Sequence, residues 1–188
     1  MPTRQGPAPY EPIVLSCSLG AALLVAGPEG LHWLALGDDP TALQAAWRRS
    51  HPTTQTLGRP PAAWVEAVHA ALEGNSQSDL PPLAPHGTPF QRRVWAALRM
   101  IPAGTRLSYR ELAQRIGQPR AARAVAAACA ANPIAVLIPC HRVVRTDGTL
   151  GGYRWGWARK HALLHRESRT ASCPRLPWTA SESLGTGA

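Results

Sequence analysis

The 188-residue chain lacks any run near the roughly 20 consecutive apolar residues that cross a bilayer. Its first residues, MPTRQGPAPYEP, contain one arginine and no apolar block, so we expect no signal peptide. No internal repeat is present. These absences predict a cytoplasmic protein that does not contact membranes.

The chain also lacks any Cys-x-x-Cys pair. Its four cysteines are scattered, at Cys17, Cys129, Cys140 and Cys173. Such spacing argues against a zinc module and, in a reducing compartment, against disulfide bonds. The hydrophobic content of 45% is that of an ordinary globular protein, so a core forms without such cross-links.

Acidic residues become scarce in the second half of the chain. Residues 1–90 hold four arginines and seven acidic residues, a net charge of −3. Residues 91–167 hold thirteen arginines and one lysine against three acidic residues, a net charge of +11. This charge asymmetry has two explanations. The basic segment is either a solvated surface that keeps the protein soluble or a binding surface for a polyanion, and we favour a nucleic acid partner.

The first half predicts a small α/β domain at residues 1–85. Short apolar or β-branched runs separated by glycine-containing turns are typical of strands, and two amphipathic stretches are typical of helices. The strands are expected at 13–18, 21–26 and 31–37, and the helices at 41–49 and 62–72. A polar, proline-rich connector at 73–87 ends this unit.

Helix-start signals divide the second half of the chain. Thr88 with Gln91, and Ser108 with Glu111, form two capping boxes, in which side chains satisfy free backbone N–H groups. Pro119 then opens a further helix after a turn of about two residues. Two helices so joined in a basic segment predict a helix-turn-helix.

The second helix of this pair, at 119–131, is nearly all alanine. The high helix propensity of alanine explains this composition by itself. Width offers a functional explanation, because an ordinary helix is about 10–12 Å across and the minor groove of DNA about 6 Å wide. A slim helix can press against a widened groove and bind DNA by shape. Arg123 is then either a solvated side chain or a group that inserts between bases.

The stretch LIPCHRVV places Cys140 beside His141. The apolar residues 135–138 predict a buried strand or extended segment, and Pro139 makes the following turn rigid. The cations after Cys140 favour its thiolate, which is the nucleophilic form. The other three cysteines are interpreted as inert.

The last segments predict three further features. Residues 145–153 are rich in turn formers and predict a hairpin or wing. Residues 157–167 predict a final helix. Residues 169–188 mix Ser, Thr, Gly and Pro without periodicity and predict a disordered tail.

Residues 87–167, through the signature PCHRV and the spacing of the helix pair, resemble the O6-alkylguanine-DNA alkyltransferases. Within that family they look closest to the C-terminal half of the bacterial adaptive-response protein. The resemblance implies an N-terminal α/β domain with a small ribonuclease H-like sheet and helices. It also implies a mainly α C-terminal domain, at 86–168, with a winged helix-turn-helix.

The resemblance further implies a reaction at Cys140. This residue would take the alkyl group from O6 of guanine in double-stranded DNA, while O4-alkylthymine stays an open question. His141 would act as its base through a bridging water, and Glu167 would orient that histidine. Asn132 would hold the turn before the cysteine. Tyr109 would promote rotation of the target nucleotide and hydrogen-bond the base.

Further roles also follow from the resemblance. Arg123 would fill the space that the flipped base leaves. The other expected DNA contacts are Tyr109, Arg120, Ala124, Ala127, Arg142 and Arg154. The expected base-pocket residues are Val143, Tyr153 and Cys129. Some relatives hold a structural zinc in the first domain, but Cys17 and His32 alone do not rebuild that site, so no metal is expected.

The product implied is a thioether, which lacks an electrophilic carbonyl for water to attack. We therefore expect a monomeric protein that acts once, without a cofactor. Two alternatives remain at this point. One is a DNA-binding regulator that performs no chemistry. The other is a cysteine hydrolase, although adjacent Cys and His residues rarely have the required geometry.

Overall fold

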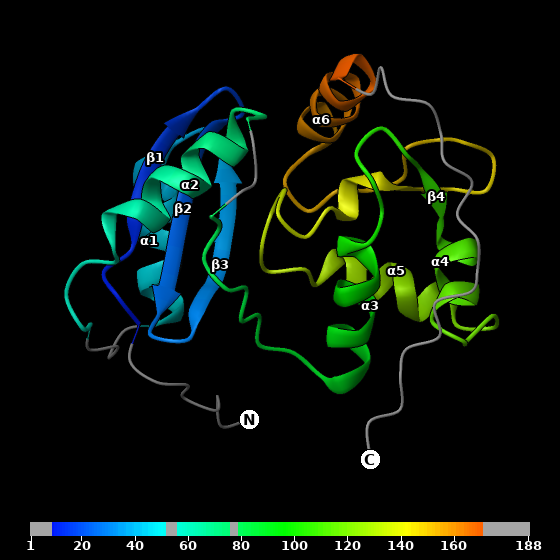
Figure 1. Ribbon diagram of the computed structural model, residues 1–188, viewed down its shortest axis with the longest axis horizontal. Coiled ribbons are helices and arrows are strands. Elements are labelled where there is room, and N and C mark those ends of the chain that lie inside the picture. Colours follow the sequence, from blue (N-terminus) through cyan, green and yellow to red (C-terminus); the bar gives the residue numbers. More distant parts are fainter. Residues whose placement is uncertain (1–8, 52–55, 76–78, 171–188) are drawn as a thin grey trace.

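The computed structural model describes residues 9–51, 56–75 and 79–170 of the chain. Figure 1 shows two groups of elements, a sheet with two helices and a mainly helical group. The first group consists of β1 (Ile13–Cys17), β2 (Gly20–Gly27), β3 (Gly30–Gly37), α1 (Pro40–Ser50) and α2 (Ala62–Leu72). All of the strands and helices expected there are confirmed.

The three strands form an antiparallel sheet with β2 at its centre. Residues 21–27 of β2 are buried without interruption, as expected for a strand covered on both faces. Gly30 begins β3 with a φ of +133°, which side chains rarely adopt. A Cβ atom there would also lie 2.1 Å from the carbonyl oxygen of Pro82, so glycine lets the connector approach the sheet.

The second group is mainly helical. It consists of α3 (Pro89–Arg99), β4 (Leu107–Ser108), α4 (Tyr109–Arg115), α5 (Ala122–Ala130), the short 3-10 helix η1 (Cys140–Arg142), β5 (Val143–Val144) and α6 (Trp157–Thr170). The two short strands pair in parallel. Both predicted capping boxes are confirmed, at the start of α3 and of α4. The indole N–H of Trp95 donates to the carbonyl of Ala128 at 2.8 Å and joins α3 to α5.

The alanine-rich helix begins later than predicted. Pro119 and Arg120 lie in a turn that is closed by a 2.9 Å hydrogen bond from the N–H of Ala121 to the carbonyl of Gln118. Proline is as well suited to the second position of such a turn as to the first turn of a helix. The prediction that the helix starts at Pro119 was therefore wrong by three residues.

The segment expected as a buried strand or extended segment at 135–138 is buried, but it is a series of turns. Only Ile134 pairs with the sheet, through a bridge to Leu34 of β3. Val136 has a φ of +64°, which ends any extended path. The side chain of Asn132 accepts a hydrogen bond from the N–H of Ile134 at 3.0 Å and draws the chain into this loop.

The hairpin or wing expected at 145–153 is a single reverse turn within the described residues. The N–H of Arg145 donates to the carbonyl of Thr149 at 2.8 Å, and Asp147 accepts from the N–H of Thr149 at 2.9 Å. Among the residues that the structure describes, no strand pairing extends from this turn, and β5 pairs with β4 alone.

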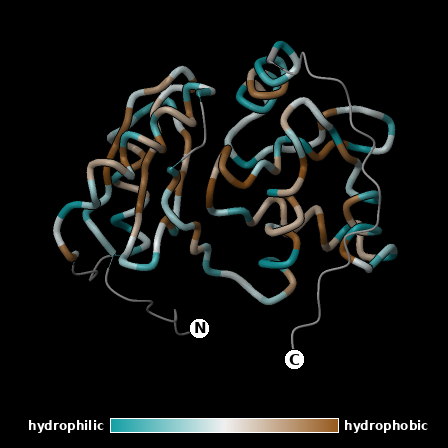
Figure 2. Tube along the Cα trace, in the orientation of Figure 1, coloured by the Kyte–Doolittle hydropathy of each residue, from teal (hydrophilic) through white to brown (hydrophobic). Residues whose placement is uncertain are grey.

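Two kinds of contact join the groups along β3. Leu34 donates to the carbonyl of Pro133 at 2.9 Å and accepts from Ala135 at 2.8 Å. Beside this bridge, the guanidinium of Arg154 lies 4.9 Å from the ring centroid of Trp33. The loop at residues 133–139, which precedes Cys140, is thereby anchored to the sheet. In Figure 2 the strands of the sheet contain hydrophobic stretches, drawn in brown.

In the part of the chain that the structure describes, no helix is long and apolar enough to span a membrane. The expected final helix is confirmed and continues to Thr170. Most of the predicted tail, residues 171–188, lies outside the described residues.

Candidate active site

Asn132 fixes the turn that carries Cys140. Its side chain is fully buried, and its Nδ2 group donates to the carbonyl of Ile138 at 2.8 Å and to the sulfur of Cys140 at 3.2 Å. The carbonyl of Ile138 also accepts from the N–H of Cys140 at 2.8 Å. One amide therefore holds both the backbone and the sulfur in place.

The sulfur of Cys140 is a neutral thiol in this structure. Burial raises the pKa of Cys140 to about 11, against smaller lowering effects of the Asn132 hydrogen bond and the Lys160 charge. Burial of the sulfur therefore outweighs the effect that the sequence analysis expected from nearby cations, because a low-dielectric environment disfavours the charged form. A base has to remove this proton when the cysteine reacts.

His141 is fully buried and bonded to Glu167. Its Nε2 atom lies 2.8 Å from a carboxylate oxygen of Glu167, and burial lowers its pKa although this carboxylate opposes the shift. The imidazole is thus neutral. Because a carboxylate only accepts, Nε2 carries the proton and Nδ1 keeps its lone pair. Nδ1 is buried and has no hydrogen-bond partner among the described residues.

Arg142 completes this group from the other side of Glu167. Its Nε lies 3.0 Å and 3.1 Å from the two carboxylate oxygens, and its Nη2 lies 2.8 Å from one of them. A further N–H of Arg142 donates to the carbonyl of Ile101. Burial alone would raise the pKa of Glu167, but the hydrogen bonds from His141 and Arg142 lower it to about 2. The carboxylate is therefore held as an anion.

Arg142 makes contacts that the sequence did not suggest, and its expected DNA contact stays a prediction. Its side chain is 11% exposed and its donors are directed to Glu167 and to a backbone carbonyl. The sequence contained no signal that distinguishes this arginine from the exposed ones around it. Its partner lies 25 residues further along the chain, on α6.

Lys160 belongs to the site and was missed. Its side chain is fully buried, and its Nζ donates to the carbonyls of Val143 at 2.7 Å and of Gly152 at 3.5 Å, and to that of Leu150. Burial lowers its pKa. Its charge favours the thiolate of Cys140. The one available signal was its identity, since it is the only lysine among twenty basic residues.

The structure brings the predicted base-pocket residues to the same centre. Val143 and Cys129 are buried, and burial raises the pKa of the Cys129 thiol, which supports its interpretation as inert. The ring of Tyr153 meets that of His141 edge-on, with centroids 6.4 Å apart. The Tyr153 hydroxyl is buried without a partner among the described residues, so the site offers an unused polar group.

Tyr109 is the first residue of α4 and is half-buried beside this centre. A Cβ atom on Gly151 would lie 3.4 Å from the Tyr109 hydroxyl, which places the phenol against the reverse turn. Burial raises its pKa, with smaller contributions from the sulfurs of Cys129 and Cys140. The phenol therefore keeps its proton and is a hydrogen-bond donor.

Helix α5 presents the expected slim face. Val125, Ala128 and Cys129 are buried, and the exposed side chains are Arg123, Ala124, Ala127 and Ala130. Arg123 is the only long side chain among these four. Arg120 is also exposed, in the turn before the helix. We call these four exposed residues of α5 the alanine face.

Arg154 contacts two tryptophan rings. Its guanidinium lies between the rings of Trp33 and Trp155, at 4.9 Å and 6.0 Å from their centroids, and donates to the carbonyl of Asn132 at 3.4 Å. Arg154 is nevertheless exposed, and the expectation that it contacts DNA stays a prediction. It stabilises the junction between the sheet and the loop before Cys140, a role that depends on distant Trp33 as well as on adjacent Trp155.

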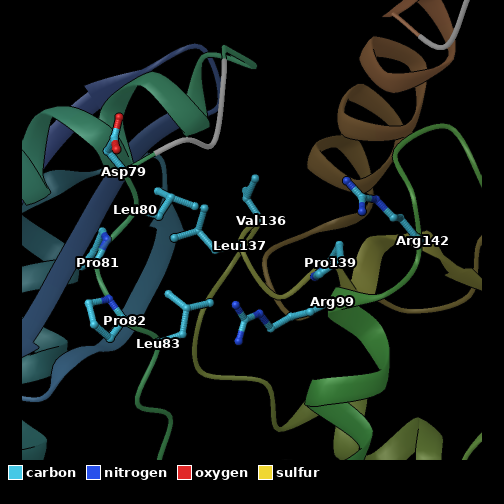
Figure 3. A pocket seen from close by; sticks show the side chains of 10 residues that line it. All are labelled: Asp79, Leu80, Pro81, Pro82, Leu83, Arg99, Val136, Leu137, Pro139 and Arg142. Carbon is cyan, nitrogen blue, oxygen red and sulfur yellow. The ribbon is translucent and has the colours of Figure 1, made fainter. Parts of the chain in front are cut away.

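A separate cavity of about 460 Å³ lies behind the cysteine loop. Figure 3 shows Leu80 and Leu83 of the connector facing Leu137 of the loop, with Arg99 and Arg142 reaching in from the helical group. The expected base-pocket residues do not line it. It is a space between connector and loop and not the site of the cysteine.

These positions define the class of site. A buried thiol, a neutral histidine with one free nitrogen, and a carboxylate that orients it form a nucleophile, a base and an orienting group. An exposed, alanine-faced helix lies beside them. The fold and site are therefore those of a protein with a cysteine nucleophile next to a surface suited to DNA.

Comparisons with known proteins agree with this class. The family model for the 6-O-methylguanine DNA methyltransferase DNA-binding domain matches residues 89–169. The methylated-DNA–protein-cysteine methyltransferase of Mycolicibacterium paratuberculosis is 43% identical over 150 residues, covering 77% of this chain and 90% of the relative. The crystal structure of the Mycobacterium tuberculosis O6-methylguanine methyltransferase has a TM-score of 0.70 and 34% identity, covering 88% and 96%.

The chain belongs to the O6-alkylguanine-DNA alkyltransferase family. It is also 46% identical over 157 residues to the bifunctional transcriptional activator and DNA repair enzyme Ada of Escherichia coli. That match covers 81% of this chain and 44% of the relative. The chain therefore spans less than half the length of that relative.

Proposed function

We propose that the protein repairs O6-alkylguanine in double-stranded DNA by transferring the alkyl group to Cys140, once and irreversibly. Several relatives are methylated-DNA–protein-cysteine methyltransferases, one of them 57% identical over 81 residues. The observation that carries the proposal is the site itself. Cys140 is held by Asn132, and His141 is bonded to Glu167 with its second nitrogen free.

Proton transfer is the first step of the proposed reaction. The neutral thiol loses its proton to Nδ1 of His141 through a bridging water, because the two side chains share no direct hydrogen bond. The resulting imidazolium is stabilised by the anionic carboxylate of Glu167, which lies 2.8 Å from Nε2. Arg142 keeps this carboxylate charged and oriented. This division of roles follows the nucleophile, base and orienting group of catalytic triads.

Displacement follows in one step. The sulfur of Cys140 forms a bond to the alkyl carbon while the bond from that carbon to O6 of guanine breaks. The hydroxyl of Tyr109 donates a hydrogen bond to the base and offsets the negative charge on the departing guanine. The product is a thioether without a carbonyl, so water does not release the alkyl group, and the protein acts once.

DNA reaches this buried sulfur only if the nucleotide leaves the duplex, at a cost of a few kcal/mol. We propose that the alanine face enters the minor groove and that Arg123 fills the space left by the base. The solved DNA complex of Mycobacterium tuberculosis OGT, with a TM-score of 0.66 and 36% identity, supports DNA as the partner. Arg120 would contact phosphates from the adjoining turn.

The finer parts of the architecture are proposed on the same basis. Residues 1–85 would form a ribonuclease H-like α/β domain, and residues 86–168 a winged helix-turn-helix domain in which the turn after Val144 is a short wing. Both would belong to a monomer that works in the cytoplasm. The small antiparallel sheet and the helices match a solved relative, and this match supports the proposed division.

Mass spectrometry after mixing with duplex DNA that contains O6-methylguanine tests the proposal. We expect Cys140 to gain one methyl group, with a yield of at most one per protein, and Cys140→Ala to gain none. Cys129→Ala, a control at a second buried thiol, should still be methylated. Repeated turnover, or methylation at another cysteine in the native chain, would refute the proposal. A regulator without chemistry would show binding but no methylated protein.

A further inference from the structure

We propose that Arg166 is a positioning residue of the repair reaction, because it fastens the end of α6 to α2 and so holds Glu167 against His141. This role rests on the proposed function, in which Glu167 orients and stabilises that histidine. Arg166 directly precedes Glu167 in the chain, and its identity does not distinguish it from the other arginines of the basic segment. Its contacts with the first group of elements do.

Helix α6 contacts both groups of elements, each with a different face. Arg159 and Arg166 are seven residues apart, and so are Lys160 and Glu167. Seven residues make nearly two turns of a helix, so each pair lies on one face and the two faces are neighbours. Lys160 and Glu167 bind groups of the active centre. Arg159 and Arg166 donate to the first group, and in Figure 1 α6 lies near the end of α2.

Arg166 is bonded to the end of α2. Its Nη1 donates to the carbonyl of Leu72, the last residue of α2, at 2.6 Å. The last carbonyls of a helix have no partner within the helix, and a cation there also complements the negative end of the helix dipole. The side chain crosses Gly74 so closely that a Cβ atom there would lie 2.9 Å from Cδ and Nε of Arg166. The arginine is therefore held by a hydrogen bond and by packing along its stem.

Arg159 makes a second attachment two turns earlier in α6. Its Nε donates to the carbonyl of Leu19 at 2.8 Å, in the turn between β1 and β2, and its Nη2 donates to Asp38. Its Nη1 donates to the carbonyl of Trp155, just before α6, at 2.9 Å. A helix that is attached at two points of one face cannot rotate about its axis without breaking one of the attachments.

Glu167 needs this support because it lies in the last turn of α6. The ends of helices fray, so a side chain there keeps its place only if the turn is held. The carboxylate lies 2.8 Å from Nε2 of His141 and accepts from the N–H of Gly104 at 3.3 Å. A shift of about 1 Å would stretch the contact with His141 beyond hydrogen-bond range. Arg166, one residue earlier, ties this turn to the first group.

Single-turnover methyl transfer by the full-length protein, at saturating duplex DNA that contains O6-methylguanine, tests the proposal. We expect Arg166→Ala to slow transfer about tenfold or more, because a misplacement of about 1 Å can cost about 10²-fold. DNA affinity should not change, since Arg166 is attached to α2. Arg166→Lys keeps a donor for the carbonyl of Leu72 and should recover much of the rate. Gly74→Ala, which displaces the stem of Arg166, should also slow transfer. The matched control is Arg169→Ala, an exposed arginine in the same turn, which should react like wild type.

A measurement without DNA separates this proposal from the proposed function. The proton on Nε2 of His141 is buried and bonded to Glu167, so its NMR signal should exchange slowly with water in wild type. In Arg166→Ala it should exchange several-fold faster, because the last turn of α6 then opens locally. The positioning role is overturned if Arg166→Ala transfers methyl at the wild-type rate, or if this proton exchanges as in wild type. It is also overturned if the backbone amides of β2 exchange faster by the same factor, which would indicate a loss of global stability alone. If wild type transfers no methyl but the variant proton exchanges faster, the proposed function fails and the positioning of Glu167 stands.

Discussion

Arginine has opposite surroundings on the alanine face of α5 and in the centre around Cys140. Arg123 is exposed on a helix surface that otherwise shows only alanine. Arg142 is nearly buried and gives its donors to Glu167 and to a backbone carbonyl. Both residues belong to the same basic segment of the sequence. The net charge of a segment thus predicts a polyanionic partner for the whole and not the role of each cation.

The largest expected effect concerns the histidine–carboxylate pair. Glu167→Gln removes the anion that stabilises the imidazolium of His141, so we expect alkyl transfer to slow by about 10²–10⁴-fold. Binding to methylated duplex DNA should change little. Single-turnover kinetics of methyl transfer and a parallel binding titration measure the two quantities. Equal losses in both would show that Glu167 serves the fold alone.

The pH profile of the wild-type protein sharpens this test. The base works only while His141 is neutral, and burial lowers its pKa in the folded protein. The rate should therefore stay level above the ordinary histidine pKa of about 6.5 and fall only at lower pH. A rate that instead rises toward the pKa of Cys140, about 11, would indicate attack by a preformed thiolate.

Replacing each arginine in turn separates the two regions. Arg142→Ala leaves Glu167 without its main cation, at a cost of about 3–5 kcal/mol in the free energy of unfolding. Arg123→Ala should leave stability unchanged but slow repair of duplex DNA. It should also make DNA binding less dependent on salt concentration, because one cation fewer displaces counterions from the duplex. Denaturant unfolding of both variants, and their DNA affinities at several salt concentrations, test these expectations. The comparison fails if Arg142→Ala changes the salt dependence instead.

The stability of the protein at acidic pH should depend on the carboxylate of Glu167. The pKa of Glu167 is about 2 in the folded protein, against an ordinary value of 4.5. Because the folded pKa is depressed, this group stabilises the fold fully above the ordinary value. The contribution, about 3 kcal/mol, is lost as the pH falls toward 2. Urea midpoints measured from pH 6 to pH 2 should show this loss in wild type and a much smaller one in Glu167→Gln.

The smallest effect is expected at the junction along β3. Trp33→Leu removes one of the two rings that flank Arg154, and such contacts contribute about 0.5–2 kcal/mol. We expect a slightly lower unfolding midpoint and unchanged DNA affinity, measured by thermal unfolding and titration. A large loss of DNA affinity would show that Arg154 contacts DNA after all.

Local patterns predicted much of the fold. The strands, the capping boxes and the final helix follow from periodicity and from contacts between residues three or four apart. Errors arose where one local preference competed with another. The apolar run before Cys140 turns because Asn132 binds its backbone, and Pro119 suits a turn as well as a helix start.

The sequence by itself determined which chemical groups are present: the PCHRV signature, the alanine-rich helix with Arg123, and Glu167 near the end of the last helix. Tertiary structure alone decided the ionisation of Cys140, the partner of Arg142, the burial of Lys160 and the attachment of Arg166 to Leu72. The reason is physical. A pKa and an ion pair depend on burial and on neighbours 25 to 94 residues away, and only packing brings those neighbours together.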